Sequence, residues 1–375
     1  MKRDALFDTA ARLHTLFGGT YAGRRVLVTG HTGFKGSWLA LWLQAMGANV
    51  FGLALPAADG PNHGRLLQLS LDAALIDVRD ATAVRVALRH FAPELVFHLA
   101  AQPLVRRGYR APAPTFDTNV MGLVNLLEAV RATPSVRVVV NATTDKCYAD
   151  RPTARGFGED DALGGHDPYS ASKACAELVS ASYRSSFLAS DDGRGHAVGL
   201  ATARAGNVVG GGDWSEDRLV PDLVRSAITG QAVPIRYPHA TRPWQHVLEP
   251  LSGYLLLGQR LLADPGEVAQ AWNFGPDAAG QLSVCEVIDA FTQHWPAVRC
   301  EVDRSLQWHE AARLQLDCRK AHARLGWRPV WGAHTTFERT AHWYRCQHER
   351  GELGSRGDLL QYVADARIAN LAWAA

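Results

Sequence analysis

The chain has 375 residues, well beyond the roughly 150 residues of an average domain, so a large domain with a smaller one attached is expected. Hydrophobic residues make up 47% and charged residues 20%, which excludes a disordered or collagen-like chain. The 39 Lys and Arg against 37 Asp and Glu leave a net charge of +2, which argues against a dedicated nucleic-acid or membrane-surface binder.

The N-terminal residues 1–19 are typical of a short amphipathic helix, in which Asp4 and Asp8 interrupt any apolar centre of a signal peptide. No apolar run approaches the roughly 18–20 residues of a membrane span. The six cysteines are scattered without a C-x-x-C pair. This pattern indicates a protein of the reducing cytoplasm, and it predicts neither a zinc site of the usual spacing nor any other metal site.

Apolar strands and helix-like segments alternate over roughly the first two hundred residues. Strands are expected at residues 26–28, 49–55, 74–77, 95–100, 136–143 and 197–205, and helices at residues 37–46, 81–91, 116–131 and 168–187. The helix at 168–187 has Asp167 as its N-cap and Pro168 at its first position. This order predicts an α/β fold in which a doubly wound parallel sheet has helices on both faces.

The alternation breaks after about Ala205, at the turn-rich stretch Gly210-Gly211-Gly212. Short strands and helices then mix, which favours a smaller mixed α/β domain that holds the substrate. A buried strand at 271–275 is expected to return to the first domain. The predicted boundaries are residues 21–205 plus about 245–276 for the first domain, and 206–244 plus 277–350 for the second.

A glycine loop lies between the first strand and the first helix of this pattern, with Gly30, Gly33 and Gly36 in G-x-x-G-x-x-G spacing. Free N–H groups and the helix dipole favour a pyrophosphate at such a turn, so dinucleotide binding is predicted. The second strand lacks the acidic residue that normally binds the adenosine ribose, which leaves NAD or NADP open. Asp77 and Val78 are candidates to hold the adenine edge.

Two further motifs carry candidate catalytic groups. Tyr169 and Lys173 form Y-x-x-x-K and lie on one helix face, where the Lys ammonium is expected to lower the pKa of the Tyr phenol. Thr144, Asp145 and Lys146 end a buried strand, where sites form in open α/β sheets. A hydroxyl, a carboxyl and an amine side by side indicate proton transfer, although a polar turn or a simple ion pair is the alternative.

Other charged residues carry weaker signals. The fifteen histidines have no metal-ligand spacing, and His98 is expected to be a packed core residue. Arg204, Arg218 and Arg242 lie around the domain junction, where a diphosphate would need cations, but arginine is abundant in this chain. Only five of the 39 basic residues are lysines, and three of these five fall within the motifs.

With these residues, the sequence resembles the extended short-chain dehydrogenase/reductase family, and within it the CDP-glucose 4,6-dehydratases. The matching stretches span about residues 23–331. They are VTGHTGFKGSWLALWL from Val28, VFHLAAQPLVRRGY from Val96, TNVMG from Thr118, NATTDKCY from Asn141, DPYSASKACAELV from Asp167, RAGNVVGGGDW from Arg204, RPWQHVLEPLSGY from Arg242, NFGP from Asn273 and LDCRKAHARLGW from Leu316. The discriminating features are Lys35, the TDK triplet with Lys146 where most sugar dehydratases of the superfamily carry Glu, and the RPWQHVLEP stretch.

The resemblance implies a Rossmann-type fold and tightly held NAD. It implies that CDP-glucose is oxidised at C4 with Tyr169 as base, that water is eliminated across C5 and C6, and that hydride returns to C6 to give CDP-4-keto-6-deoxyglucose. Asp145 would be the acid and Lys146 the C5 base, with a pKa lowered by burial and by Lys173. Thr144 would hydrogen-bond the phenol of Tyr169 or the sugar 4-oxygen.

The resemblance also implies the binding residues. The expected cofactor-binding residues are Gly30, Thr32, Gly33, Phe34, Lys35, Gly36, Asp77, Val78, Leu99, Ala100, Ala101, Tyr169 and Lys173. The expected substrate-binding residues are Gln102, Asn207, Arg218, Arg242 and His246. A homodimer or homotetramer is expected, with helices 116–131 and 168–187 pairing as a four-helix bundle, in the deoxysugar biosynthesis that serves O-antigen lipopolysaccharide. A nucleotide-sugar 4-epimerase, or a 4,6-dehydratase of another nucleotide sugar, is the alternative.

Overall fold

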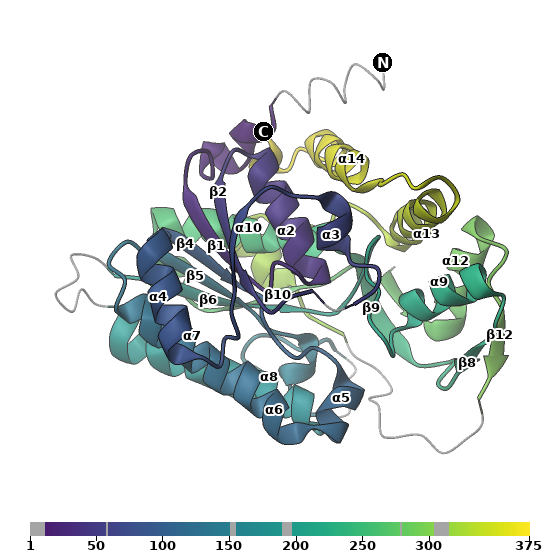
Figure 1. The fold of residues 1–375 in the computed structure, drawn as a ribbon, viewed down its shortest axis with the longest axis horizontal. Helices are drawn as coiled ribbons and strands as arrows, with labels where there is room; N and C mark the ends of the chain where they lie inside the picture. The colour runs from purple at the N-terminus through teal and green to yellow at the C-terminus, as the bar shows by residue number, and fades with distance from the viewer. Residues whose placement is uncertain (1–11, 58, 151–154, 190–196, 278–279, 304–314) are drawn as a thin grey trace.

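A computed structural model describes residues 12–57, 59–150, 155–189, 197–277, 280–303 and 315–375 (Figure 1). Most of the expected N-terminal helix, residues 1–11, lies outside these ranges. The centre of the fold is a seven-stranded sheet of order β10-β6-β5-β4-β1-β2-β3, in which every neighbouring pair is parallel. Its strands are β1 (Arg25–Thr29), β2 (Asn49–Ala54), β3 (Asp72–Leu75), β4 (Leu95–His98), β5 (Val138–Ala142), β6 (Gly199–Ala205) and β10 (Ala271–Phe274).

Side chains of a strand alternate between the two sides of the sheet, so apolar side chains lie on both faces. Helices cover both of these faces. Val26 and Val28 of β1 belong to one hydrophobic core and Leu27 to the other. The first core packs under α2 (Phe34–Ala45) and α10 (Leu248–Ala263). The second packs under α4 (Ala81–Phe91), α7 (Gly122–Arg131) and α8 (Pro168–Tyr183). The predicted fold class, a doubly wound parallel α/β sheet, is confirmed.

The second part of the chain has its own hydrophobic core, which includes Trp244, Phe337 and Trp343. Two small sheets and three helices surround this core. One sheet holds β7 (Asn207–Val209), β9 (Thr241–His246) and β11 (Gln281–Ser283), and the other holds β8 (Val233–Ile235) and β12 (Cys300–Val302). The helices are α9 (Leu219–Thr229), α12 (Val284–His294) and α13 (Ala333–Arg350).

The remaining α-helices lie around these two parts. They are α3 (His63–Leu67), α5 (Val105–Arg110), α6 (Pro112–Phe116), α11 (Pro265–Val268) and the C-terminal α14 (Ser355–Ile368). α14 returns to the first part, where the Tyr362 hydroxyl donates to Glu249 at 2.8 Å and its ring meets Trp42 edge-on. The pattern of strands and helices in the sequence did not predict that α14 returns to the first part.

Most expected elements are confirmed within one or two residues, and the strand at 271–275 does return, because β10 pairs with β6. The helix expected at 116–131 begins earlier, with α6, and passes through the π-helical turn Asp117–Met121 before α7. The exact domain boundaries given above stay a prediction.

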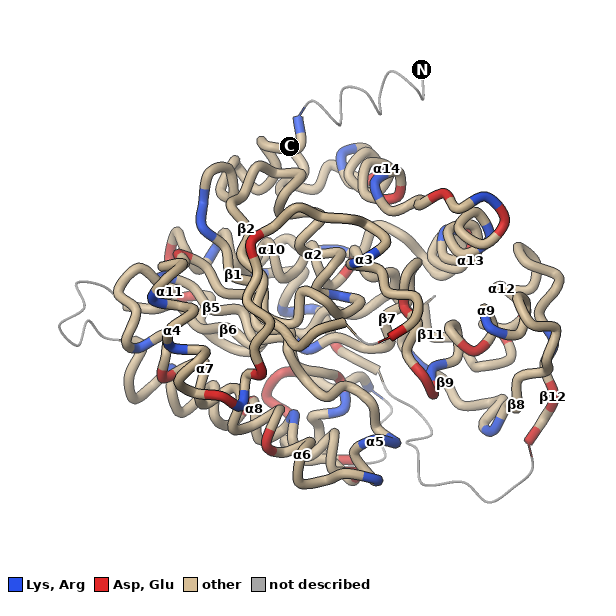
Figure 2. Tube along the Cα trace, in the orientation of Figure 1, with Lys and Arg blue, Asp and Glu red and all other residues tan. Residues whose placement is uncertain are grey.

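Acidic and basic residues are interspersed along the trace in Figure 2. Within the described ranges, no helix is both long and apolar enough to cross a membrane, and His, Cys, Asp and Glu form no cluster of three or more that could hold a metal ion.

Candidate active site

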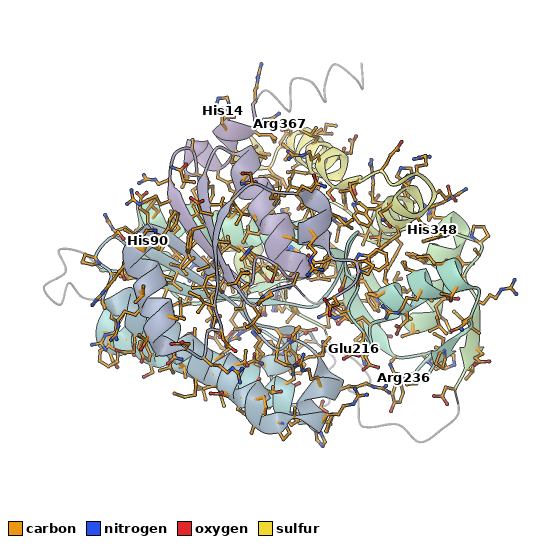
Figure 3. The ribbon with its side chains drawn as sticks, viewed as in Figure 1. His14, His90, Glu216, Arg236, His348 and Arg367 are labelled. Atoms are coloured by element: carbon orange, nitrogen blue, oxygen red, sulfur yellow. The ribbon has the colours of Figure 1, made fainter. Side chains whose placement is uncertain are left out.

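A cavity of about 800 Å³ lies where the carboxyl ends of the central strands face the second part of the chain. Its wall includes Gly30 after β1, Leu99 after β4, Ala142 at the end of β5 and Ala205 at the end of β6. Arg236, labelled in Figure 3, closes the wall from the second part. Ligands of open α/β sheets bind in this position, so the cavity is the candidate active site.

The glycine loop forms the floor under the N-terminus of α2. Gly30 has a φ of +74°, and a Cβ there would lie 2.8 Å from the Ala100 backbone nitrogen. A Cβ at Gly36 would collide with the carbonyl oxygen of Gly30. Gly33 is the N-cap of α2 in an extended conformation and meets only the Gly30 oxygen, at 3.3 Å. The loop therefore leaves helix N–H groups open to the cavity, as a pyrophosphate requires.

The other residues expected to hold a dinucleotide also line the cavity. They are Thr32, Phe34, Lys35, Asp77, Val78, Leu99, Ala100 and Ala101. The Asp77 carboxylate forms a 2.6 Å ion pair with Arg79, which lowers the pKa of Asp77 and places an arginine in the cavity wall just after β3. The sequence analysis did not single out this arginine.

The Thr144–Asp145–Lys146 triplet turns the chain away from β5. Thr144 caps the 3₁₀ turn Asp145–Cys147 and donates to Asp145 Oδ1 at 3.0 Å. Lys146 Nζ donates to the same oxygen at 3.1 Å and to Asn207 Oδ1 at 3.2 Å. Asp145 is 1% exposed, and its second oxygen, Oδ2, has no hydrogen-bond partner among the described residues. Thr144 and Lys146 line the cavity, whereas Asp145 lies behind them.

The Tyr169–Lys173 pair projects from the first turns of α8 into the same wall. Tyr169 is hydrogen-bonded to Thr144. The expected lowering of its pKa by Lys173 is wrong, because burial dominates. Burial raises the pKa of Tyr169 to about 12, and the hydrogen bond with Thr144 and the charge of Arg218 only partly oppose this effect.

The three lysines of the site differ in how strongly the surrounding protein affects them. Burial lowers the pKa of Lys35 to about 7, helped by the charges of Arg218 and Lys173, and it lowers the pKa of Lys173 to about 8. The burial expected at Lys146 is not found, since its side chain is 26% exposed and ion-paired with Asp145. Among the described residues of the cavity wall, nine Lys and Arg side chains outnumber six Asp side chains, which suits an anionic ligand.

Four of the five expected substrate-binding residues line the cavity: Gln102, Asn207, Arg218 and Arg242. The fifth, His246, does not, because it is fully buried between the rings of Trp38 and Trp331. Arg204, another candidate cation, is also absent from the wall, because it is buried in a 2.9 Å ion pair with Glu177.

The cavity also has cations that the sequence analysis overlooked, although the quoted motifs contain two of them. Arg106 and Arg107 of α5 line it, and Arg106 forms a 2.9 Å ion pair with Asp217 across the cavity from the second part. Asp217 has a left-handed φ of +57°. Nothing in the sequence indicated that this pair would meet.

The fold and this site together define a dinucleotide-dependent enzyme of the extended short-chain dehydrogenase/reductase type. A sequence profile described as GDP-mannose 4,6-dehydratase matches residues 27–340, and the chain belongs to that family. The chain is 47% identical to a CDP-glucose 4,6-dehydratase of Salmonella typhimurium over 328 residues, which cover 87% of this chain and 91% of that protein. The expected resemblance to nucleotide-sugar 4,6-dehydratases is therefore confirmed.

Solved structures of nucleotide-sugar enzymes have the same fold as this chain. A dTDP-glucose 4,6-dehydratase of Streptomyces venezuelae, solved with NAD, is 27% identical with a TM-score of 0.71, and the match covers 87% of this chain and 98% of that one. A UDP-glucose 4-epimerase of Thermus thermophilus, solved with NAD, is also 27% identical, with a TM-score of 0.74 and coverage of 86% and 99%. The fold is thus shared by dehydratases and epimerases, and the site must distinguish them.

Proposed function

We propose that the protein is an NAD-dependent lyase that converts CDP-glucose to CDP-4-keto-6-deoxyglucose. The 47% identity to the CDP-glucose 4,6-dehydratase of Salmonella typhimurium supports the choice of nucleotide. The proposal divides the cavity as the sequence analysis did, with the cofactor against the first domain and the nucleotide sugar toward the second. Arg218 and Arg242 are the proposed partners of the sugar diphosphate.

The observation that carries the proposal is the state of the Asp145 carboxyl group. One oxygen is occupied by Thr144 and Lys146, and the other, Oδ2, is buried without a partner. An unpartnered buried acceptor costs free energy until a donor reaches it. Oxidation at C4, which an epimerase also performs, needs no such carboxyl, whereas elimination needs an acid for the departing 6-oxygen.

The residues around the glycine loop fit NAD. The loop brings the open N-terminus of α2 to the cavity. Only glycine fits at position 36, because a Cβ there would collide with the loop backbone, and this close turn is what a pyrophosphate needs. When bound, the nicotinamide supplies the hydride acceptor and donor of the reaction. Structural relatives that carry NAD support this assignment.

The chain's own residues account for the proton movements. Tyr169, hydrogen-bonded to Thr144, takes the proton of the sugar 4-hydroxyl, and the charge of Arg218 stabilises the phenolate in this buried wall. A proton moved along the 3.1 Å contact from Lys146 to Asp145 leaves a neutral amine and a carboxylic acid. Lys146 then takes the C5 proton while Asp145 protonates the departing 6-oxygen, which restores the ion pair and releases water. Lys146 gives a proton back to C5 when hydride returns to C6.

The nucleotide is tested by turnover with CDP-, dTDP-, UDP- and GDP-glucose under identical conditions. CDP-glucose is expected to give a 4-keto-6-deoxy product with the highest kcat/KM of the four. A higher kcat/KM with another nucleotide sugar would reject CDP-glucose while leaving the dehydratase assignment in place.

Replacing Gly33 by Val is expected to abolish cofactor retention and leave the fold intact. A Cβ at Gly33 meets only the Gly30 oxygen, so the fold can accept a side chain, and because Gly33 lines the cavity that side chain is expected to obstruct the pyrophosphate. Gly36→Val is expected to lower the melting temperature as well, because its Cβ collides with the loop backbone. The measurement is NAD content of the purified variants beside their thermal unfolding. Stoichiometric NAD in Gly33→Val would show that the loop is misassigned.

We infer a homodimer that forms through α6, α7 and α8, which lie side by side along one edge of the molecule in Figure 1. Large apolar side chains on these helices and on the π-helical turn between α6 and α7 are exposed to solvent: Phe116 by 36%, Met121 by 49% and Leu178 by 60%. An exposed apolar face of this kind is typical of an association surface. A second copy of the same helices would cover it as a four-helix bundle.

Replacing Leu178 by Arg is expected to convert the dimer to a monomer, because a charge would be buried unpaired at the interface. Sedimentation velocity at micromolar concentration measures this change. Ile368→Arg is the matched control, since Ile368 is 79% exposed on α14 and away from these helices. A wild-type chain that sediments as a monomer would reject the dimer.

A further inference from the structure

One face of α8 is hydrogen-bonded to three successive residues at the end of β5. Residues four apart share a helix face, so Tyr169, Lys173 and Glu177 form a single stripe. Each of the three is hydrogen-bonded to a different one of the successive residues. The pairs are Tyr169 with Thr144, Lys173 with the Ala142 carbonyl at 3.1 Å, and Glu177 with the Thr143 hydroxyl at 2.5 Å. The site therefore has a third contact that the proposed proton steps do not use.

Glu177 is 3% exposed, and both of its carboxylate oxygens accept hydrogen bonds. Beside Thr143, it accepts a hydrogen bond from Thr202 at 2.7 Å and a charge-assisted one from Arg204 at 2.9 Å. Arg204 in turn donates to the Tyr148 hydroxyl at 2.8 Å. This network ties α8, β5 and β6 together directly behind the catalytic wall.

Glu177 keeps its negative charge in this setting. Burial works against the charge, but the hydrogen bond and charge of Arg204 outweigh it, so the pKa of Glu177 lies below its ordinary value. Lys173, one turn earlier, has a pKa lowered by burial to about 8, and Glu177 is the largest of the influences that raise it again. The titratable groups that interact with Lys173 are Glu177 of α8, Cys147 after β5, His98 of β4 and Lys35 of α2, and its ammonium donates to the Ala142 carbonyl.

We propose that Glu177 is a positioning residue of this active site, which keeps the Lys173 ammonium charged and fixes the register of α8 against the Thr144–Lys146 turn. It touches neither the cavity nor the expected ligands, and it acts through Lys173 and Thr143. The proposal rests on the proposed function only in that Lys173 serves the cofactor-dependent step.

The electrostatic half of the proposal is tested on Lys173 itself, without reference to activity. The chain has only five lysines, so NMR of protein labelled with ε-¹³C lysine resolves them, and Lys173→Arg assigns the signal. In Glu177→Gln, the Lys173 titration midpoint is expected to fall by about one pH unit from its wild-type value, because an attractive charge has been removed. Thr202→Val removes one hydrogen bond to Glu177 but leaves its charge, and it is expected to keep the wild-type midpoint.

Glu177→Gln leaves Arg204 buried without its counter-charge, which destabilises a fold strongly. The double variant Glu177→Gln with Arg204→Met removes both charges and is expected to give the same downward shift. A folded single or double variant whose Lys173 midpoint equals that of the wild type overturns the electrostatic role. An unchanged Lys320 midpoint in Glu177→Gln serves as the internal control.

Glu177→Asp tests the geometric half, because it keeps the charge but shortens the reach to Thr143. It is expected to lower kcat at least about tenfold, with KM for the nucleotide sugar and the Lys173 midpoint unchanged. A wild-type kcat overturns the positioning role. If the wild-type enzyme does not dehydrate CDP-glucose, the proposed function fails, whereas the lysine titration still decides the role of Glu177.

Discussion

Asp145→Asn is expected to lower formation of the 4-keto-6-deoxy product by about 10²–10⁴-fold while oxidation at C4 survives. The amide has nearly the shape of the carboxyl group and can still contact Thr144, but it cannot deliver a proton to the departing 6-oxygen. The oxidation depends on Tyr169 and its hydrogen bond to Thr144, which the substitution leaves in place. Single-turnover absorbance of the bound nicotinamide, recorded beside product release, separates the two steps.

The matched control is Asp358→Asn, which also removes a buried carboxylate from an ion pair, here with Arg339 at 3.4 Å. Asp358 is not part of the cavity wall, so this variant is expected to turn over like the wild type. Normal turnover by Asp145→Asn would mean that the triplet is a polar strand end, and it would favour an epimerase.

Tyr169→Phe is expected to fail one step earlier, with no absorbance change of the bound nicotinamide and a loss of about 10²–10⁴-fold in the oxidation itself. The substitution removes the phenol oxygen, which is the group proposed to take the proton of the 4-hydroxyl. The ring fills the same buried space, so the fold and NAD content are expected to stay.

Tyr183→Phe is the control for this change, because Tyr183 ends the same helix and its hydroxyl donates to Glu128 at 2.8 Å, away from the cavity. It is expected to keep wild-type rates. An absorbance change of normal size in Tyr169→Phe would remove Tyr169 from the role of base.

Local patterns predicted the parts of the fold and site that depend on neighbours in the sequence. The strand–glycine–helix unit around Gly30 follows from an apolar run, a turn that needs a positive φ, and an apolar helix. The Y-x-x-x-K spacing places Tyr169 and Lys173 on one helix face for the same reason. The parallel sheet also predicted that the residues after β1, β4 and β5 would meet at one edge, and they do.

The rest depends on contacts between distant segments, which no spacing reveals. Lys35, Lys146 and Lys173 look alike in the sequence, yet the folded chain buries Lys173 and leaves Lys35 and Lys146 partly exposed. The pKa of Tyr169 follows burial rather than its neighbour in the motif. His246 was predicted to bind the substrate and Arg204 was one of three candidate cations, but the folded chain packs His246 between tryptophans and uses Arg204 to balance Glu177.

The central claim is elimination across C5 and C6 rather than inversion at C4, and the fate of the C4 hydrogen tests it most directly. The enzyme is incubated with CDP-glucose that carries deuterium at C4, and the product is analysed by NMR. The account predicts a 4-keto-6-deoxy sugar with the deuterium at C6 and a solvent-derived hydrogen at C5. Deuterium that remains at C4 of a CDP-hexose, with inverted configuration and no loss of water, would contradict it.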